Sequence, residues 1–226
     1  MQLSATIDGH PYDLIDPPID ISIPLKFNGP QPNTYGVPKA EGAAYEQDGW
    51  VGDVRRGGNC NFETYTLTPH CNGTHTECIG HLTGDRVSLH KMLRDSFIPA
   101  TLVTVNPQAA RYSEDQYSPA LNADDQVIDR KMLEEVFLYE NTAFSRALVI
   151  RTAPNSEAKK SRDYMQMPPP FFTLEAARYL RQIGVDHLLV DLPSVDRLFD
   201  EGQLSVHHIF WDIPAGTHEA TPESGR

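Results

Sequence analysis

The chain has 226 residues, of which 39% are hydrophobic, so it is long enough to bury the core of one large domain. Its formal net charge of -12 argues against a nucleic-acid partner, because proteins that bind phosphate backbones carry a basic surface. No segment reaches the roughly 18 apolar residues of a membrane helix, and the N-terminus has no basic stretch before an apolar run, so we expect a cytoplasmic protein without a membrane partner.

The first third of the chain is predicted to contain strands and one long loop. An Asp8-Gly9 turn between two short alternating segments predicts a β-hairpin near the N-terminus. Ile19–Ile23 alternates apolar with polar residues and predicts a strand. Phe27–Gly58 is rich in Gly, Pro, Asn and Tyr without a sustained period, which predicts a long surface loop. Phe62–Thr68 alternates and is rich in aromatic and β-branched residues, which predicts a further strand.

The central part of the chain shows two buried strands and a helix. Leu102–Val105 and Ala147–Ile150 are short apolar runs of the kind found in buried strands. Arg130–Phe137 has apolar residues at helical spacing. This order of elements favours a fold in which helices pack on a sheet.

The last third contains the clearest helix of the sequence, at Thr173–Ile183. Thr173 is the expected N-cap, and Gly184 lies just past the last turn. A buried strand follows in VDHLLVDLPS and ends at Pro193. We therefore predict a single α/β domain over residues 1–226, with residues 215–226 as a disordered polar tail.

A segment rich in metal ligands, HCNGTHTECIGH, follows the predicted strand at His70–His81. If the chain is extended here, alternate residues share a face, and Cys71, His75 and Glu77 point the same way. Thiolate, imidazole and carboxylate suit zinc, and a site dominated by the last two also takes manganese. His81 is then a general acid or base in the hydrolysis of an amide, ester or lactam.

Two other interpretations of the same segment are open. A His-rich turn can serve only to satisfy buried backbone groups, and Cys78 beside Ile79 can be a small core residue. Alternatively, Cys71 or Cys78 is the nucleophile of a cysteine hydrolase, with a nearby histidine as its base. The three cysteines are an odd number in a sequence without a secretory signal, which favours reduced thiols or metal thiolates over a disulfide framework. The absence of a Cys-x-x-Cys pair argues against a zinc finger.

The motif resembles that of the cyclase family that includes bacterial kynurenine formamidase, whose signature is His-x-Gly-Thr-His-x-Asp-x-Pro-x-His. The matching stretch here is GTHTECIGH at Gly73–His81. A second likeness covers Gly184–Trp211, where the sequence contains Gly-Val-Asp, a Pro-Ser-x-Asp turn and a downstream His-His pair. The resemblance implies a swivelling β/β/α-type domain that forms homo-oligomers.

The resemblance also implies roles for individual residues. His75 and Glu77 become metal ligands, with Glu77 placed to bridge two ions, and His81 becomes the acid/base. His207 becomes the distal ligand, preferred over His208 because adjacent residues of a strand face opposite ways. The implied activity is hydrolysis of a carbon–nitrogen bond in a small-molecule amide, formamide or cyclic amide by metal-bound hydroxide, with arylformamidase as the nearest named activity and Zn2+, or else Mn2+, as the cofactor.

The sequence departs from the family pattern in four places: Glu77 stands for the aspartate of the signature, Ile79 stands for its proline, and the other two concern the first histidine and the distal glutamate. The first histidine of the signature aligns with Cys71, so either this thiolate replaces it or a shifted turn brings in His70. The family's distal glutamate lies on a strand after the His-His pair, and here only Glu219 is a candidate, so a chain clipped before that strand is an alternative explanation. These departures support a second hypothesis, a catalytically silent relative that binds a metabolite or a partner.

Overall fold

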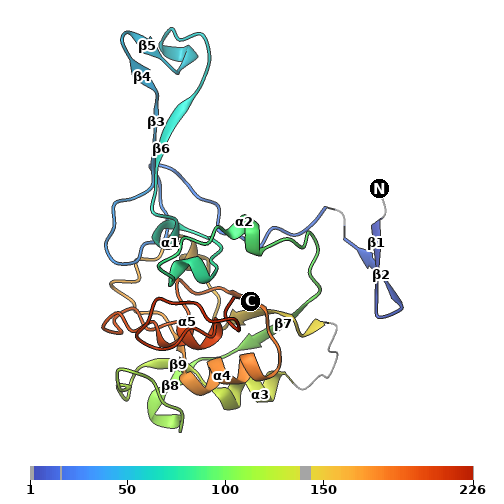
Figure 1. Ribbon diagram of the computed structural model, residues 1–226. Coiled ribbons are helices and arrows are strands. Elements are labelled where there is room, and N and C mark those ends of the chain that lie inside the picture. Colours follow the sequence, from blue (N-terminus) through green and yellow to red (C-terminus); the bar gives the residue numbers. More distant parts are fainter. Residues whose placement is uncertain (1–2, 16, 138–143, 226) are drawn as a thin grey trace. The chain divides into compact units, whose positions relative to one another are not determined.

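The computed structural model describes residues 3–15, 17–137 and 144–225 (Figure 1). Its contacts divide the chain into two compact units. The first unit comprises Met1–Ile21, Thr76–Asn155 and Pro169–Arg226, and the second comprises Ser22–His75 and Ser156–Pro168. No helix within the described ranges has the length and apolar character that crossing a membrane requires.

A three-stranded parallel sheet lies at the centre of the first unit. It contains β7 (Ala100–Val105), β10 (Ala147–Thr152) and β12 (His187–Val190) in the order β12-β10-β7. Both strands predicted from short apolar runs are confirmed, as is the strand after Gly184. Parallel neighbours need a crossover connection, and each crossover here carries a helix, so the mixed α/β class is also confirmed.

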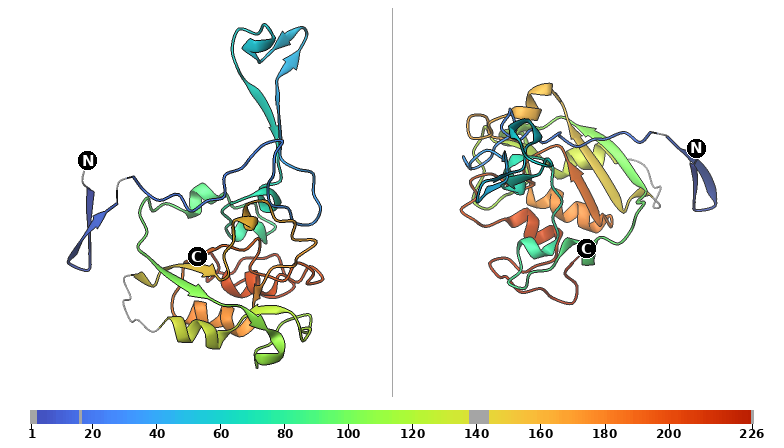
Figure 2. Two further views of the ribbon diagram at one scale, coloured as in Figure 1. Left: turned by 180° about the vertical axis from the view of Figure 1, so that it is seen from behind. Right: turned by 90° about the horizontal axis from the view of Figure 1, so that it is seen from above.

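The two crossover helices begin at the capping residues of their first turns. In α3 (Arg130–Val136) the carboxylate of Asp129 accepts a hydrogen bond from the third residue of the helix. In α4 (Leu174–Gln182) the hydroxyl of Thr173 does the same, and Gly184 follows the helix at a φ of 81°. Both predicted helices are confirmed, and they lie side by side, with α3 in contact with β7 (Figures 1 and 2).

The core of the first unit is completed by a second small sheet and one more helix. Strands β11 (Phe171–Phe172), β9 (Gln126–Ile128) and β8 (Gln108–Ala109) form a three-stranded sheet in the order β11-β9-β8. Helix α5 (Ser205–Phe210) contacts α4. The largest fully buried apolar side chains come from these elements and their connections: Phe172, Ile128, Leu133, Leu148, Ile150, Leu180, Val105, Val127, Val185 and Val206.

The first unit also contains the predicted N-terminal hairpin. Strands β1 (Leu3–Ile7) and β2 (His10–Leu14) pair in antiparallel register. Asp8 and Gly9 have positive φ values of 48° and 79°, as a two-residue primed turn requires. A further short helix, α2 (Leu89–Met92), follows the ligand-rich segment.

The second unit holds an antiparallel extension and the start of the ligand-rich segment. Strand β3 (Glu41–Ala44) pairs with β6 (Glu63–Thr66), and β4 (Glu46–Gln47) pairs with β5 (Trp50–Val51). Helix α1 (Pro69–Asn72) is a single turn. The strand predicted around β6 is confirmed.

Two predictions for the first third of the chain are corrected. The long loop predicted at Phe27–Gly58 contains β3, β4 and β5. β3 pairs with β6, which lies outside the predicted loop, whereas β4 and β5 pair across Asp48 and Gly49, whose positive φ values of 49° and 84° form a two-residue turn that the prediction overlooked. The strand predicted at Ile19–Ile23 is wrong, since these residues form no ladder. Prolines precede and follow that segment, and Ile19 and Ile21 are 75% and 68% exposed, so its alternation does not reflect one buried face.

The C-terminal segment from Ala215 to Gly225 forms turns without a helix or strand. It nevertheless makes specific hydrogen bonds within the first unit. The Ser224 hydroxyl donates to the Asp212 carbonyl at 2.6 Å, and the Gly84 N–H donates to the His218 carbonyl at 2.9 Å.

Candidate metal centre

Glu77 and His81 come from a short irregular segment of the first unit. His81 closes a 3-10 turn at Ile79–His81, in which its N–H donates to the Cys78 carbonyl at 2.8 Å. Gly80 is required at the middle of this turn, since an added Cβ would lie 2.3 Å from the Val87 carbonyl oxygen. The close approach of these two backbone segments fixes the turn that presents His81.

His207 comes from α5, which corrects the prediction that the His-His pair lies in a strand. Because the pair is helical, its two side chains do not point to opposite faces of a sheet, and both are buried, at 6% and 5% exposed. His208 bonds through Nδ1 to the Ile213 carbonyl at 3.1 Å, which is a structural contact within the core. His207 instead faces Glu77.

The first unit brings Glu77, His81 and His207 together. His207 Nε2 lies 3.3 Å from one carboxylate oxygen of Glu77, and His81 Nε2 lies 3.9 Å from the other. One ligand atom from each residue falls within 4.8 Å of the other two. Two ligands of a tetrahedral zinc ion, at about 2.1 Å each, are separated by roughly 3.4 Å, so this arrangement is near the size that such an ion needs.

Asp196 holds His207 from the side opposite Glu77. One carboxylate oxygen accepts hydrogen bonds from His207 Nδ1 at 2.6 Å and from the His207 backbone N–H at 3.1 Å. The other accepts from the Val206 N–H at 2.8 Å and from the Tyr117 hydroxyl at 2.6 Å. The Tyr117 oxygen in turn accepts from the Arg197 N–H at 3.0 Å. A completely buried carboxylate thus caps the first turn of α5 and fixes the imidazole ring.

The turn that carries Asp196 is itself positioned by the first unit. Within the predicted Pro-Ser-x-Asp turn, the Asp196 N–H donates to the Ser194 hydroxyl at 3.1 Å. The Val195 carbonyl accepts from the N–H of Phe172 on β11 at 3.0 Å. Asp191, at the end of β12, accepts from both the N–H and the hydroxyl of Thr152 at the end of β10. The carboxyl ends of two adjacent parallel strands therefore hold this loop.

Burial and charge shift the acid–base behaviour of this network. Burial alone lowers the pKa of His207, but its hydrogen bonds to Asp196 and Glu77, together with their charges, raise that pKa to about 9. Burial opposes ionisation of Asp196, yet the bonds and charge of His207, aided by Tyr117 and Val206, hold the pKa of Asp196 below its usual range. Burial and the Asp196 charge raise the pKa of Tyr117. His207 is therefore cationic at neutral pH, with a proton on the nitrogen that faces Glu77.

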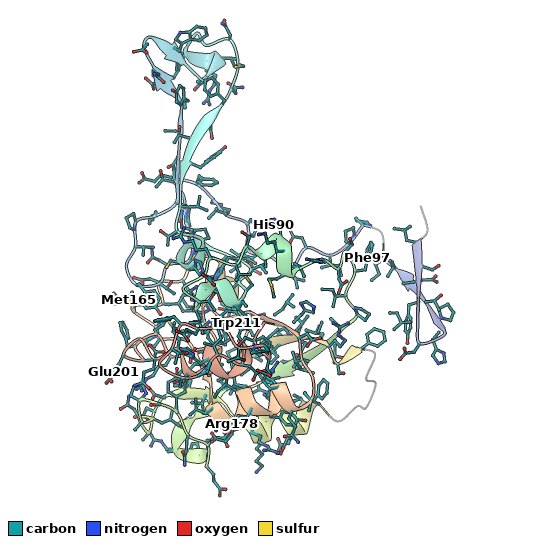
Figure 3. All side chains as sticks on the ribbon, viewed as in Figure 1. His90, Phe97, Met165, Arg178, Glu201 and Trp211 are labelled. Atoms are coloured by element: carbon teal, nitrogen blue, oxygen red, sulfur yellow. The ribbon has the colours of Figure 1, made fainter. Side chains whose placement is uncertain are left out.

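The Trp211 ring packs beside both His81 and His207. Trp211, at the end of α5, is 6% exposed, and its ring centroid lies 5.2 Å from that of His207 and 6.3 Å from that of His81. It lies among the buried side chains of this unit, whereas Arg178 and Glu201 project outward (Figure 3). The side chain of His81 is 29% exposed and that of His207 is 7% exposed, so His81 is the more accessible of the two.

The remaining predicted ligands lie in the second unit. His70 and His75 have ring centroids 4.9 Å apart, and His75 Nδ1 bonds the Gly73 carbonyl at 3.0 Å. Cys71 is buried within α1, so the segment is not extended at this residue and the alternation assumed for Cys71, His75 and Glu77 is interrupted. Gly73 is not required by a close approach, because an added Cβ would only touch Leu25 at 3.8 Å.

The thiols give no support to a cysteine nucleophile. Cys78 is 8% exposed, and its thiol donates to the Val87 carbonyl at 3.4 Å. Cys71 is buried to the same extent, and Cys60 is exposed. Cys78 therefore behaves as the small buried residue that one interpretation of the sequence expected.

A family model for cyclases matches residues 19–197, which is more than three quarters of the chain. The chain belongs to the cyclase family. Comparison with curated proteins finds no match for this cyclase. The family match includes Glu77, His81 and Asp196 but ends ten residues before His207. The grouping of His207 with Glu77 and His81 therefore comes from the structure of the first unit.

Asp196 and Tyr117 are the residues of this network that the sequence did not reveal as functional candidates. The Pro-Ser-x-Asp sequence predicts a turn, but it does not indicate the hydrogen-bond partner of the aspartate. That partner lies eleven residues later on α5, and Tyr117 lies seventy-nine residues earlier in the chain. Neither contact follows a local pattern.

Proposed function

We propose that this cyclase is a metal-dependent hydrolase of carbon–nitrogen bonds in a small-molecule amide, formamide or cyclic amide, with arylformamidase as the nearest named activity. The observation that carries the proposal is the arrangement of Glu77, His81 and His207 in one cluster, with Asp196 bonded to the far nitrogen of His207. A metal site that only stabilises the fold would need no group beyond its ligands. His81 is a third, more accessible group beside Glu77 and His207, and this favours a catalytic site.

The donor set fits a divalent ion. A carboxylate and an imidazole with its second nitrogen bonded to a buried carboxylate are the usual ligand and supporting groups of catalytic zinc. His207 Nε2 and a carboxylate oxygen of Glu77 lie 3.3 Å apart, so these two residues would hold such an ion. We propose zinc, with manganese as the alternative suited to carboxylate and imidazole.

Each residue then has a distinct task. Glu77 and His207 would hold the ion, which when bound supplies an activated water and polarises the substrate carbonyl. Asp196 keeps the proton of His207 on Nδ1 and so leaves Nε2 for the ion. His81 donates a proton to the leaving nitrogen as the carbon–nitrogen bond breaks, which its greater exposure allows.

The other parts of the proposal depend on the family resemblance. By that resemblance we propose His75 as a further ligand. The first ligand of the signature would be Cys71 or His70. We further propose a single swivelling β/β/α-type domain, a cytoplasmic location and a homo-oligomer.

The test is metal content measured together with hydrolysis. We expect the purified chain, loaded with zinc and dialysed, to retain the metal and to release formate from an N-formyl anilide. His207→Ala should lose both properties, while His81→Ala should retain the metal and lose hydrolysis. His90→Ala, which removes an exposed histidine of the same unit, is the matched control and should behave as the wild type.

Two outcomes would contradict the proposal. A wild-type chain that retains neither zinc nor manganese and leaves formyl anilides and lactams intact would favour the catalytically silent relative. Inactivation by thiol alkylation, with no effect of chelators, would favour a cysteine nucleophile.

A further inference from the structure

The C-terminal segment Ala215–Gly225 has no part in the proposed chemistry, yet it is bonded to the chain that follows His81. The imidazole of His218 donates through Nδ1 to the Leu82 carbonyl at 2.8 Å. The Gly84 N–H donates to the His218 carbonyl at 2.9 Å. A single residue of the segment therefore makes one side-chain bond and one backbone bond to the residues directly after the proposed acid.

Leu82 is the residue at which the 3-10 turn of His81 ends. Its N–H donates to the Ile79 carbonyl at 2.9 Å, and the residue is only 5% exposed. Gly80 holds the other side of the turn through its close approach to Val87. The bond from His218 to the Leu82 carbonyl therefore acts on a turn that is already tightly packed, at a point one residue from His81.

The same C-terminal segment is bonded to the end of α5, the helix that carries His207. The Ser224 hydroxyl donates to the Asp212 carbonyl at 2.6 Å. The Gly225 N–H donates to the Trp211 carbonyl over a longer distance of 3.4 Å. The segment therefore joins the two pieces of the first unit that supply His81 and His207.

Beyond Ser224 the segment returns to the His81 turn. A Cβ added to Gly225 would lie 3.0 Å from Cδ1 of Ile79 and 3.3 Å from Cε of Met92, so the end of the described chain lies against both the turn and α2 (Figure 1). The segment thus contacts the first residue of the turn as well as Leu82 at its end. These contacts fix the backbone of the turn from a direction that Val87 does not cover.

We propose that His218 is a positioning residue, which orients the His81 imidazole by bonding the chain beside it. The inference rests on the proposed function, in which His81 donates a proton to the leaving nitrogen. The ring of His207 is fixed by Asp196, whereas the side chain of His81 is 29% exposed and depends more on its backbone for its position. An acid must lie within hydrogen-bond reach of the leaving group, and a displacement of about 1 Å can cost roughly 100-fold in rate.

The test compares His218→Ala with His218→Asn in the zinc-loaded full-length chain. The amide nitrogen of asparagine can donate to the Leu82 carbonyl from nearly the place of Nδ1, whereas alanine has no donor. For formate release from an N-formyl anilide, we expect His218→Ala to lower kcat about tenfold, the effect of one lost hydrogen bond. KM and zinc content should not change, because the ligands keep their own supports.

His218→Asn should recover most of the lost kcat. The matched control is Glu223→Ala, at an exposed residue of the same segment, which should behave as the wild type. The proposal would be overturned if His218→Ala kept the wild-type kcat, if it lost its zinc, or if His218→Asn were as impaired as His218→Ala.

A second measurement does not depend on hydrolysis, so it separates this inference from the proposed function. Hydrogen–deuterium exchange of residues 79–84, followed by mass spectrometry, should be about fivefold faster in His218→Ala than in the wild type and should be restored in His218→Asn. Exchange of α4 should stay the same in all three proteins. If the chain is inactive but exchange responds in this way, the proposed function is wrong and His218 still fixes the turn. Equal exchange of residues 79–84 in the three proteins would overturn the role of His218.

Discussion

Replacing Asp196 with asparagine tests the network that holds His207. Both carboxylate oxygens accept two hydrogen bonds, and all four partners are donors. Asparagine keeps the volume but has one acceptor oxygen, so its amide nitrogen must face two buried donors. Each lost bond costs about 1–3 kcal/mol, and a shift of the His207 proton to Nε2 relieves part of this cost. We expect the free energy of unfolding of the metal-free protein to fall by roughly 2–4 kcal/mol.

The assay is urea unfolding in the presence of a chelator, followed by circular dichroism. The matched control is Asp85→Asn, which makes the same charge change at an exposed residue of the same unit and should alter stability by less than about 0.5 kcal/mol. If Asp196→Asn were as stable as this control, the carboxylate would not be ionised and bonded as the structure indicates. The account of His207 would then be wrong.

Three further predictions concern the same unit. Asp196→Asn should also weaken the affinity for zinc about 10–100-fold, because a proton shifted to Nε2 of His207 occupies the ligand position. Calorimetry measures this affinity, and an unchanged value would refute the supporting role of Asp196. Tyr117→Phe removes the hydroxyl that bonds Asp196 and the Arg197 N–H, so the unfolding free energy should fall by about 1–3 kcal/mol in the same urea assay, and a smaller loss would show that these groups find other partners. Thr173→Ala removes the hydroxyl that caps α4 and donates to Asp115, so it should cost about 2 kcal/mol, whereas Thr173→Ser keeps both bonds and should cost less than half as much; equal losses would exclude these bonds as the cause.

The parts of the fold that the sequence predicted correctly depend on local chemistry. Asp8 and Gly9 tolerate the positive φ of a tight turn, and Thr173 and Gly184 cap the ends of α4 whatever surrounds them. The segment Ile19–Ile23 shows where this reasoning fails. Its alternation matches a strand, but a strand also needs a partner with free donors and acceptors, and no local signal reports that partner.

The candidate site was predictable only in part for the same reason. The ligand-rich segment identified Glu77 and His81 because their residue types and spacing are unusual on the surface of a loop. We assumed an extended segment with side chains on alternate faces, but the segment contains the helical turn α1 and the 3-10 turn that ends at His81. The assumption therefore placed Cys71 on the same face as residues that lie beyond α1. The network of Asp196 with His207 depends on how α5 packs, and that is decided by the core as a whole.

The cost of burying this network favours a function over a purely structural role. Removing an aspartate and a cationic histidine from water costs hydration free energy, and the attraction between the two charges offsets only part of that cost. Apolar residues of similar volume would often give a more stable core. Capping α5 requires only the carboxylate of Asp196, as its bonds to the two backbone N–H groups show. It does not require an imidazole whose other nitrogen faces the partly exposed Glu77 beside His81. A ligand at that nitrogen explains this arrangement, because a divalent ion offsets the negative charges that the fold has gathered around one ring.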